Sequence, residues 1–359
     1  MASLKEKIGQ MIITGLQGSE LTQEEHHLLR DYPFGGFILF GHNLKEPKQI
    51  VSLCRSLWET RKGLPPFIAI DQEGGRVHRL PAPFTHFPPM ADLGRTGNAS
   101  LAYGVGLATA RELSAIGINL NFAPVLDVHS NPNNPVIGDR SLSSEPEKVI
   151  ALAWPIIQGL RDGGIIPCGK HFPGHGDTAE DSHFDLPVVH KDEASLKAVE
   201  LPPFIDACRK KIESLMTAHV LYPSLDPRNP ATLSRPVVTD LLRGELGYEG
   251  VIFGDDMEMK AISKNYALEE ALALSVEAGV DVVMSCHQDE AAVRAFESLL
   301  RQAEKETEQM ARVKESYRRI KELKQRYLKC FTGVREQELE KSLGFPRHQN
   351  LVEEIQGSL

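Results

Sequence analysis

The chain has 359 residues, of which 41% are hydrophobic and 25% are charged, as in a typical globular protein. Its formal net charge of −9 argues against a nucleic-acid or anionic-membrane partner, because both need a basic surface. No apolar run reaches the roughly 18 residues of a membrane helix. The N-terminus lacks a signal-peptide pattern, and the five cysteines are scattered without CxxC spacing. Together these features predict a cytoplasmic protein with free thiols.

Short apolar runs alternate with helical stretches along the chain. The expected strands are Met11–Thr14, Gly36–Phe40, Phe67–Ile70, Ile118–Phe122, Ile165–Cys168, Leu215–Thr217, Val251–Phe253 and Val280–Met284. Several are apolar throughout, as strands buried on both faces are. The expected helices between them include Glu46–Thr60, Ser100–Ile116, Pro146–Asp162, Asp192–Glu200 and Leu268–Ala278. The alternation predicts an α/β fold, a single (β/α)8 barrel of the TIM type, with a doubly wound open sheet as the alternative.

The end of the chain has a different pattern. From about Glu304 to Leu328 it is strongly charged, and apolar residues recur at helical spacing. We expect a C-terminal amphipathic helix packed on the outside of the barrel, in a monomer; a dimer contact is the less favoured alternative. No linker, repeat or low-complexity tract interrupts the chain. We therefore expect one catalytic domain over residues 1–330 and a C-terminal tail over residues 331–359.

Unusual polar residues fall where the expected strands end. Asp71 follows the third strand, Asp127 comes after the fourth, Lys170 follows the fifth, His219 the sixth and Asp255 the seventh. A (β/α)8 barrel builds its active site at the carboxyl ends of its strands. The positions of these residues therefore support both a barrel and a site at its mouth.

The segment Asp71-Gln-Glu-Gly-Gly-Arg-Val-His-Arg79 follows the third strand. Asp71 can accept hydrogen bonds from sugar hydroxyls, and Arg76 and Arg79 are fork-shaped donors. Only one of the two arginines need reach a ligand, and we expect the other to be structural. A second loop contains Arg140 directly after Asp139, where a surface ion pair is the alternative to ligand binding.

The run Lys170-His-Phe-Pro-Gly-His-Gly-Asp-Thr-Ala-Glu-Asp-Ser-His183 is the richest in titratable groups. One hypothesis is a metal site of imidazoles and carboxylates. The favoured hypothesis is a dyad in which Asp181 orients His183, whose imidazole gives and later takes a proton. For His175 a role in folding the loop is favoured.

The seventh strand ends in two adjacent acids, Asp255 and Asp256. Adjacent residues at a strand end point to opposite sides, so only one should face the barrel mouth. A carboxylate there can act as a nucleophile or bind a metal, and the other acid can cap the next helix. These residues alone do not decide which acid has which role.

Four motifs resemble glycoside hydrolase family 3, in its bacterial β-N-acetylglucosaminidase (NagZ-type) branch. They are Asp71-Gln-Glu-Gly-Gly-Arg76, Asn134-Pro-Val-Ile-Gly-Asp-Arg140, Lys170-His-Phe-Pro-Gly-His-Gly-Asp177 with Asp181-Ser-His183, and Val251-Ile-Phe-Gly-Asp-Asp-Met257. They occur in one order within a resemblance that runs from about Leu4 to about Leu328. The resemblance implies a (β/α)8 barrel and retaining release of terminal β-linked N-acetylglucosamine. Gly254 departs from relatives, which often have Ser or Thr before the nucleophile.

The resemblance also implies roles for individual residues. Asp255 matches the nucleophile, His183 the general acid/base and Asp181 its dyad partner. The positions that bind the sugar are matched by Asp71, Arg79, Arg140, Lys170 and His171. It implies a small saccharide substrate, with muropeptides of wall recycling as in cytoplasmic Gram-negative relatives, and no metal or organic cofactor.

Several alternatives stay open from the sequence. Within the family these are a β-glucosidase and a phosphorylase, since a neutral imidazole base admits an anionic acceptor such as phosphate in place of water. Outside the family, the alternatives are a metal-dependent barrel hydrolase using His171, His175, Asp177 and His183, and a catalytically silent sugar-binding protein.

Overall fold

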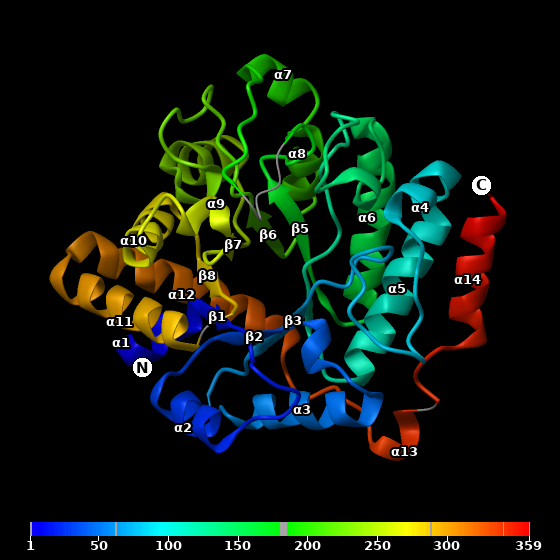
Figure 1. Cartoon of the computed structure of the whole chain (residues 1–359), viewed down its shortest axis with the longest axis horizontal. Helices are drawn as coiled ribbons and strands as arrows, with labels where there is room; N and C mark the ends of the chain where they lie inside the picture. Colours follow the sequence, from blue (N-terminus) through cyan, green and yellow to red (C-terminus); the bar gives the residue numbers. More distant parts are fainter. Residues whose placement is uncertain (1, 62, 180–184, 288, 340, 359) are drawn as a thin grey trace.

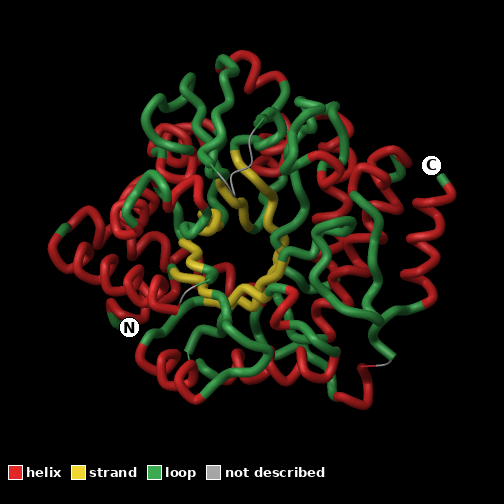
Figure 2. Tube along the Cα trace, viewed as in Figure 1, coloured by secondary structure: helices red, strands yellow, loops and turns green. Residues whose placement is uncertain are grey.

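Eight parallel strands close into a barrel in a computed structural model that describes residues 2–61, 63–179, 185–287, 289–339 and 341–358. The strands are β1 (Ile12–Thr14), β2 (Gly36–Leu39), β3 (Phe67–Ile70), β4 (Leu120–Asn121), β5 (Ile166–Phe172), β6 (Ser214–Thr217), β7 (Val251–Asp256) and β8 (Val282–Ser285). Each pairs with its neighbours in sequence, and β8 pairs with β1 to complete the ring (Figure 2). The predicted (β/α)8 barrel is therefore confirmed.

Helices surround the ring of strands (Figure 1). They are α1 (Leu4–Gln10), α2 (Gln23–Asp31), α3 (Pro47–Glu59), α4 (Met90–Thr96), α5 (Ala99–Ala115), α6 (Pro146–Asp162), α7 (Glu193–Ala198), α8 (Pro202–Arg209), α9 (Lys260–Ser263), α10 (Leu268–Ala278), α11 (Asp289–Lys305), α12 (Thr307–Tyr327), α13 (Glu336–Leu339) and α14 (Pro346–Gly357). Short 3-10 turns cover Gly41–Asn43, Gly138–Arg140 and Ala231–Leu233, and Pro236–Glu245 is a π-helix.

The barrel interior is filled by aromatic side chains. Phe253 of β7 packs edge-on against Phe67 of β3 and Phe122 after β4, with ring centroids 5.8 and 5.5 Å apart. All three rings are fully buried. Edge-to-face packing suits the charge distribution of aromatic rings, and these residues make the barrel a solid core beneath the site.

The expected amphipathic helix is α12, and its apolar side packs against α1 and α11. Val313, Ile320 and Leu323 are buried on this side. Lys324 is buried as well, and its ammonium donates to Gln10 Oε1 and Gly35 O, both at 2.6 Å. The prediction of a C-terminal helix packed on the barrel is confirmed.

The segment after α12 adds two helices to the molecule. Helix α13 contacts α3, and α14 contacts α4 and α5. Figure 1 shows α14 at the edge of the molecule beside α4 and α5. Across the described ranges, none of the helices has both the length and the apolar character needed to span a membrane.

Candidate active site

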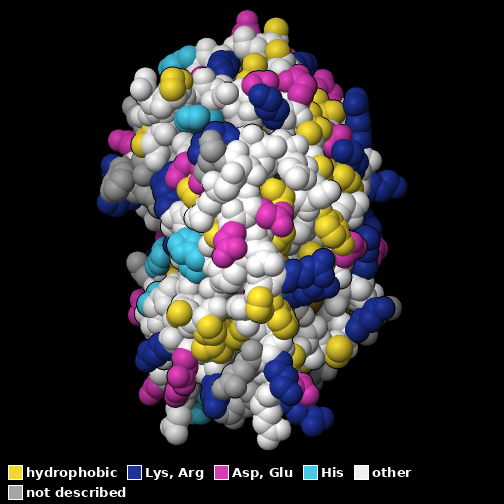
Figure 3. Space-filling view, turned by 90° about the vertical axis from the view of Figure 1, so that its right-hand side faces the viewer, with side chains coloured by type: hydrophobic (Ala, Val, Ile, Leu, Met, Phe, Trp, Pro, Cys, Tyr) yellow, Lys and Arg dark blue, Asp and Glu magenta, His cyan; other side chains and the backbone are white. Residues whose placement is uncertain are grey.

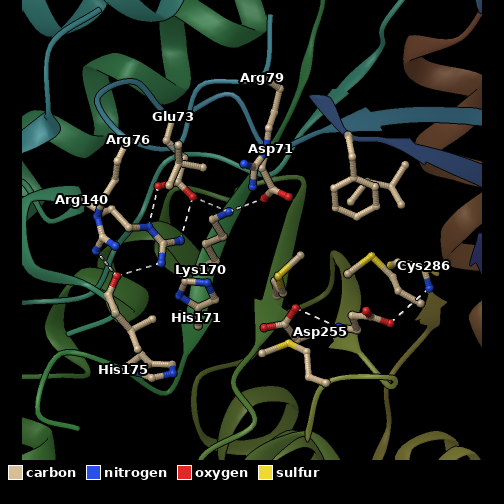
Figure 4. Close-up of a pocket in the computed structure, with 18 of the residues that line it drawn as sticks. Asp71, Glu73, Arg76, Arg79, Arg140, Lys170, His171, His175, Asp255 and Cys286 are labelled. Atoms are coloured by element: carbon tan, nitrogen blue, oxygen red, sulfur yellow. Dashed lines mark hydrogen bonds and ion pairs between the residues drawn. The ribbon is translucent and has the colours of Figure 1, made fainter. Parts of the chain in front are cut away.

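A pocket of about 240 Å³ opens at the carboxyl ends of the strands. It brings together six of the eight site residues that the sequence indicates, and Figure 4 shows them facing a common space: Asp71, Arg79, Arg140, Lys170, His171 and Asp255. The other two, Asp181 and His183, lie outside the described residues. Three residues that directly follow or end strands, Asp71, Lys170 and Asp255, thus share one pocket, whereas Asp127 and His219 do not line it.

An ion network forms one wall of the pocket. Lys170 Nζ lies 2.6 Å from both Asp71 Oδ1 and Glu73 Oε1. Arg140 donates two parallel hydrogen bonds of 2.8 Å to the two carboxylate oxygens of Glu73. The side chains of Lys170 and Glu73 are each only 2% exposed. Since fork-to-fork geometry is both strong and directional, the network holds Asp71 and Arg140 rigidly at the pocket surface.

The network stays charged although it is buried. Burial alone would raise the pKa of Glu73, but the Arg140 and Lys170 cations outweigh it and hold that pKa far below its usual range. Burial would lower the pKa of Lys170, but Asp71 and Glu73 outweigh it and raise that pKa. Two cations therefore face two carboxylates, and the wall offers fixed charges to a ligand without a net excess of either sign.

The expected alternative for Arg140, an ion pair with Asp139, is wrong. Asp139 pairs instead with Arg76, whose Nε lies 3.0 Å from Asp139 Oδ1. The 3-10 turn over Gly138–Arg140 directs the two neighbouring side chains apart, so Arg140 reaches Glu73. Arg76 also donates to the carbonyl of Val136, which gives it a structural role.

Arg79 differs from Arg76 in its lack of partners. Its guanidinium forms no hydrogen bond with any described residue, and its buried Nε is unpaired. The backbone N–H of Arg79 donates to Gln72 Oε1 at 2.9 Å. Figure 4 shows Arg79 beside Asp71. Of the two arginines, Arg79 is thus the one with donors available to a ligand.

Buried Asp127 organises the start of the loop after β5. Its Oδ2 lies 2.7 Å from His171 Nδ1, and its Oδ1 accepts from the backbone N–H groups of His171 and His175. Burial would raise the pKa of Asp127, but the His171 imidazole outweighs it and lowers that pKa. His175 Nδ1 lies 2.9 Å from Thr178 Oγ1, and the His175 carbonyl accepts from Asn134. The folding role predicted for His175 is confirmed.

Asp255 lies at the end of β7 and lines the pocket. Its Oδ1 accepts the backbone N–H of Asp256 at 2.8 Å. Burial would raise the pKa of Asp255, but the imidazoles of His219 and His171, the Asp256 N–H and the Lys170 ammonium lower it below the usual value. Asp255 is therefore an ionised carboxylate in the pocket.

Asp256 has a structural role. Its Oδ1 accepts the backbone N–H groups of Glu258 and Cys286, both at 3.2 Å. It does not cap the next helix, since the N-cap of α9 is Met259. The expectation that only one acid faces the mouth is also wrong, because both line the pocket. The register shifts between Phe253 and Asp256, which interrupts the regular alternation at the end of the strand.

Glu73 and His287 are among the pocket residues that reasoning from the sequence missed. Glu73 lies within the Asp71–Arg79 segment, and the two cations expected at the site should have indicated a counter-charge. His287 follows β8, where the same strand-end rule would have found it. Its Nε2 lies 3.2 Å from Asp256 Oδ2, and its ring stacks on Phe40 with centroids 5.4 Å apart.

The part of the chain that the structure describes contains no group of three or more His, Cys, Asp or Glu side chains placed to hold a metal ion. Asp177, one of the candidate ligands, lies 3.2 Å from Lys191 Nζ.

Comparison with known proteins places this site in a family. Residues 3–323 match the family model described as "Glycosyl hydrolase family 3 N terminal domain". A β-hexosaminidase of Alkalilimnicola ehrlichii is 40% identical over 286 residues, which cover 78% of this chain and 81% of that protein.

Solved structures agree with the sequence match. A family 3 β-N-acetylglucosaminidase from Paenibacillus sp. superposes with a TM-score of 0.94 at 40% identity, over 100% of this chain and 69% of that one. NagZ from Neisseria gonorrhoeae, solved with N-trifluoroacetyl-D-glucosamine, gives a TM-score of 0.80 at 31% identity, with 97% of each chain covered. The chain therefore belongs to glycosyl hydrolase family 3 and is a glycoside hydrolase.

Proposed function

We propose that this chain is an exo-acting, retaining β-N-acetylglucosaminidase. The observation that carries the proposal is the ionised Asp255 carboxylate, which lines the same pocket as the network of Asp71, Glu73, Lys170 and Arg140. Relatives and structural neighbours named β-hexosaminidase and β-N-acetylglucosaminidase support the choice of sugar. The pocket volume of about 240 Å³ is below the roughly 300–1,000 Å³ of sites for drug-sized ligands. This size favours one terminal sugar over an internal stretch of a polysaccharide.

In the first step, a carboxylate oxygen of Asp255 attacks the anomeric carbon. The bond from that carbon to the leaving oxygen breaks, and His183 gives the leaving oxygen its proton. The product is a glycosyl ester of Asp255. A carboxylate with a lowered pKa is ionised at neutral pH, as this step requires.

In the second step, His183 takes a proton from water, and the resulting hydroxide oxygen attacks the anomeric carbon. The ester bond breaks, and Asp255 leaves as a carboxylate. Asp181 would hold the tautomer of His183 and stabilise its imidazolium. These two assignments rest on the motif resemblance. His171 and His175, which precede Asp181 and His183 in the sequence, are held by hydrogen bonds to Asp127. The segment that leads to the proposed dyad therefore starts from a fixed position.

The opposite wall would bind the hydroxyl groups of the sugar. Asp71 is an acceptor, while Arg79, Arg140 and Lys170 are donors. The side chain of Asp71 is 19% exposed, and that of Arg140 is 11% exposed. Part of each side chain is therefore accessible from the pocket. His171 is held with one ring nitrogen on Asp127, which leaves its other nitrogen available to the substrate.

The decisive experiment compares an aryl β-N-acetylglucosaminide with the matching aryl β-glucoside, each in water and in phosphate buffer. We expect efficient release only from the N-acetylglucosaminide, with free sugar as the product. Preference for the glucoside would overturn the choice of sugar. Sugar 1-phosphate as the main product would replace hydrolysis by phosphorolysis.

We further propose muropeptides as natural substrates and the cytoplasm as their location, on the strength of the resemblance to recycling enzymes. Incubation with purified muropeptides should release N-acetylglucosamine from the non-reducing end. If these substrates stay intact while the aryl substrate is cleaved, the natural substrate is a different β-N-acetylglucosaminide.

A further inference from the structure

The C-terminal segment meets the loop between β3 and α4 (residues 71–89) at one buried carboxylate. Glu112 of α5 is 3% exposed, and its Oε1 lies 2.8 Å from His348 Nδ1 and accepts the N–H of Gly344 at 3.2 Å. The same carboxylate accepts the N–H and the hydroxyl of Thr85, at 2.8 and 2.7 Å. Four donors from two distant segments therefore converge on Glu112.

The backbone of the two segments also lies in direct contact. Gly344 has φ of +57°, and a Cβ atom there would lie 2.6 Å from the carbonyl oxygen of Pro83. A larger residue would be strained and would push the segments apart. Leu351 of α14 packs over Gly104 of α5, where an added Cβ would come within 2.9 Å of it.

A chain of contacts leads from Thr85 to the pocket. The ring of His86 stacks on that of His78, with centroids 4.0 Å apart, and His86 Nε2 lies 2.9 Å from the carbonyl oxygen of Gly75. His78 Nδ1 lies 2.6 Å from Gln72 Nε2, and Gln72 Oε1 accepts the N–H of Arg79. Burial lowers the pKa of His78 to about 4, so the stacked pair carries no charge on His78 at neutral pH.

Arg79 lies at the end of this series of contacts, where its backbone N–H is held by Gln72. Because its guanidinium has no hydrogen-bond partner among the described residues, only its backbone and packing place it in the pocket. We propose that the segment Gly344–His348, through Glu112, is a positioning element for Arg79 and so determines sugar affinity. This segment lies beyond residues 3–323 that match the family model.

Figure 3 shows the side of the molecule on which α14 lies, where charged and hydrophobic side chains are interspersed. The segment thus covers α5 as part of an ordinary mixed surface, while His348 itself is only 2% exposed. Its buried hydrogen bond with Glu112 connects this surface to the loop that follows β3. The role is one of positioning, since His348 does not line the pocket.

The test uses the full chain and rests on the proposed function. His348→Ala should raise the KM for the aryl N-acetylglucosaminide about fivefold and leave kcat within about twofold. It should also speed amide hydrogen exchange in residues 75–88. His348→Asn, whose amide can replace the imidazole donor, should restore much of the affinity. Glu353→Ala, an exposed change on the same helix, is the matched control and should change neither value.

A double variant separates positioning from stability. If His348 acts through Arg79, adding His348→Ala to Arg79→Ala should raise KM no further. Additive effects on KM, or a lowered melting temperature with an unchanged KM, would overturn the inference and leave the proposed function intact. If Arg79→Ala alone leaves KM unchanged, Arg79 has no role in sugar binding. The sugar-binding role proposed for Arg79 and the positioning role proposed for Gly344–His348 would then both be wrong.

Discussion

The two walls of the pocket are built on different principles. The wall from β3 and β5 is a buried ion network in which Lys170 and Arg140 share Glu73 between them. The wall from β7 and β8 holds Asp255 among sulfur-containing side chains, those of Met216, Met259, Met284 and Cys286. Each charge of the Asp71, Glu73, Lys170 and Arg140 network is matched by a neighbour, whereas Asp255 has no ion pair among the described residues.

In the proposed mechanism, this difference separates the residues that bind the sugar from the residue that reacts with it. A fully paired network is costly to disturb, so it keeps its geometry and suits the recognition of hydroxyl groups. A carboxylate without a direct ion pair is available to attack an electrophilic carbon, because no salt bridge must be broken first. Changes to the β7 side should therefore affect kcat, and changes to the network should affect KM and stability.

Asp255→Ala should have the largest effect on activity. Removing the proposed nucleophile should lower kcat about 10⁴-fold, by analogy with other nucleophilic enzymes, while the melting temperature changes little. Initial rates on an aryl N-acetylglucosaminide measure this. The matched control is Asp256→Asn, which should lower stability through its lost turn contacts but retain far more activity. Near-parental rates in Asp255→Ala would refute the assignment.

Glu73→Gln tests the network wall. The change keeps the shape but leaves Lys170 and Arg140 without their shared anion, which should cost about 3 kcal/mol of unfolding free energy. We expect KM to rise more than kcat falls. Denaturant unfolding measures the loss of unfolding free energy, and steady-state kinetics measure KM and kcat. A variant with normal stability and a lowered kcat alone would show that Glu73 belongs to the chemistry.

Stability should fall in acid because of the buried carboxylates. Glu73, Asp127 and Glu112 all have folded-state pKa values below their usual ones. Their stabilisation is therefore complete above the ordinary carboxyl pKa of about 4 and is lost as pH falls through the lowered values. Melting temperatures from pH 7 to pH 3 should decrease below about pH 4.5. A flat profile in this window would show that these groups are not stabilised by their partners.

Removal of metals should have the smallest effect. Because neither wall needs a metal in the proposed mechanism, dialysis against a chelator should change kcat by less than about twofold. Metal analysis of the protein before and after dialysis completes the measurement. Stoichiometric zinc, with activity lost on chelation and restored by zinc, would favour the metal-dependent alternative over the Asp181–His183 dyad.

The fold could be predicted because several buried strands are apolar runs, as in Phe67–Ile70, and because helical stretches separate the runs. The position of the pocket followed from polar residues directly after those strands. The partners could not be predicted. Nothing near Arg140 in the sequence points to Glu73, which is 67 residues away, and the adjacent Asp139 pointed to the wrong pair.

Irregular strand ends were a second cause of error. Alternation of side chains predicts opposite directions for Asp255 and Asp256, but the register shift at the end of β7 brings both to the pocket. The hydrogen bond between His348 and Glu112 joins residues 236 positions apart, and no local sequence pattern reveals such a contact.

The most direct test of the account is to trap the sugar on the enzyme. A fluorinated N-acetylglucosaminide with a good leaving group forms the first ester readily and releases it slowly, so peptide mass mapping can locate it. We predict a mass increase of one sugar on Asp255. An adduct on another residue, or turnover of the substrate with no adduct and an inverted anomeric product, would contradict the proposed mechanism.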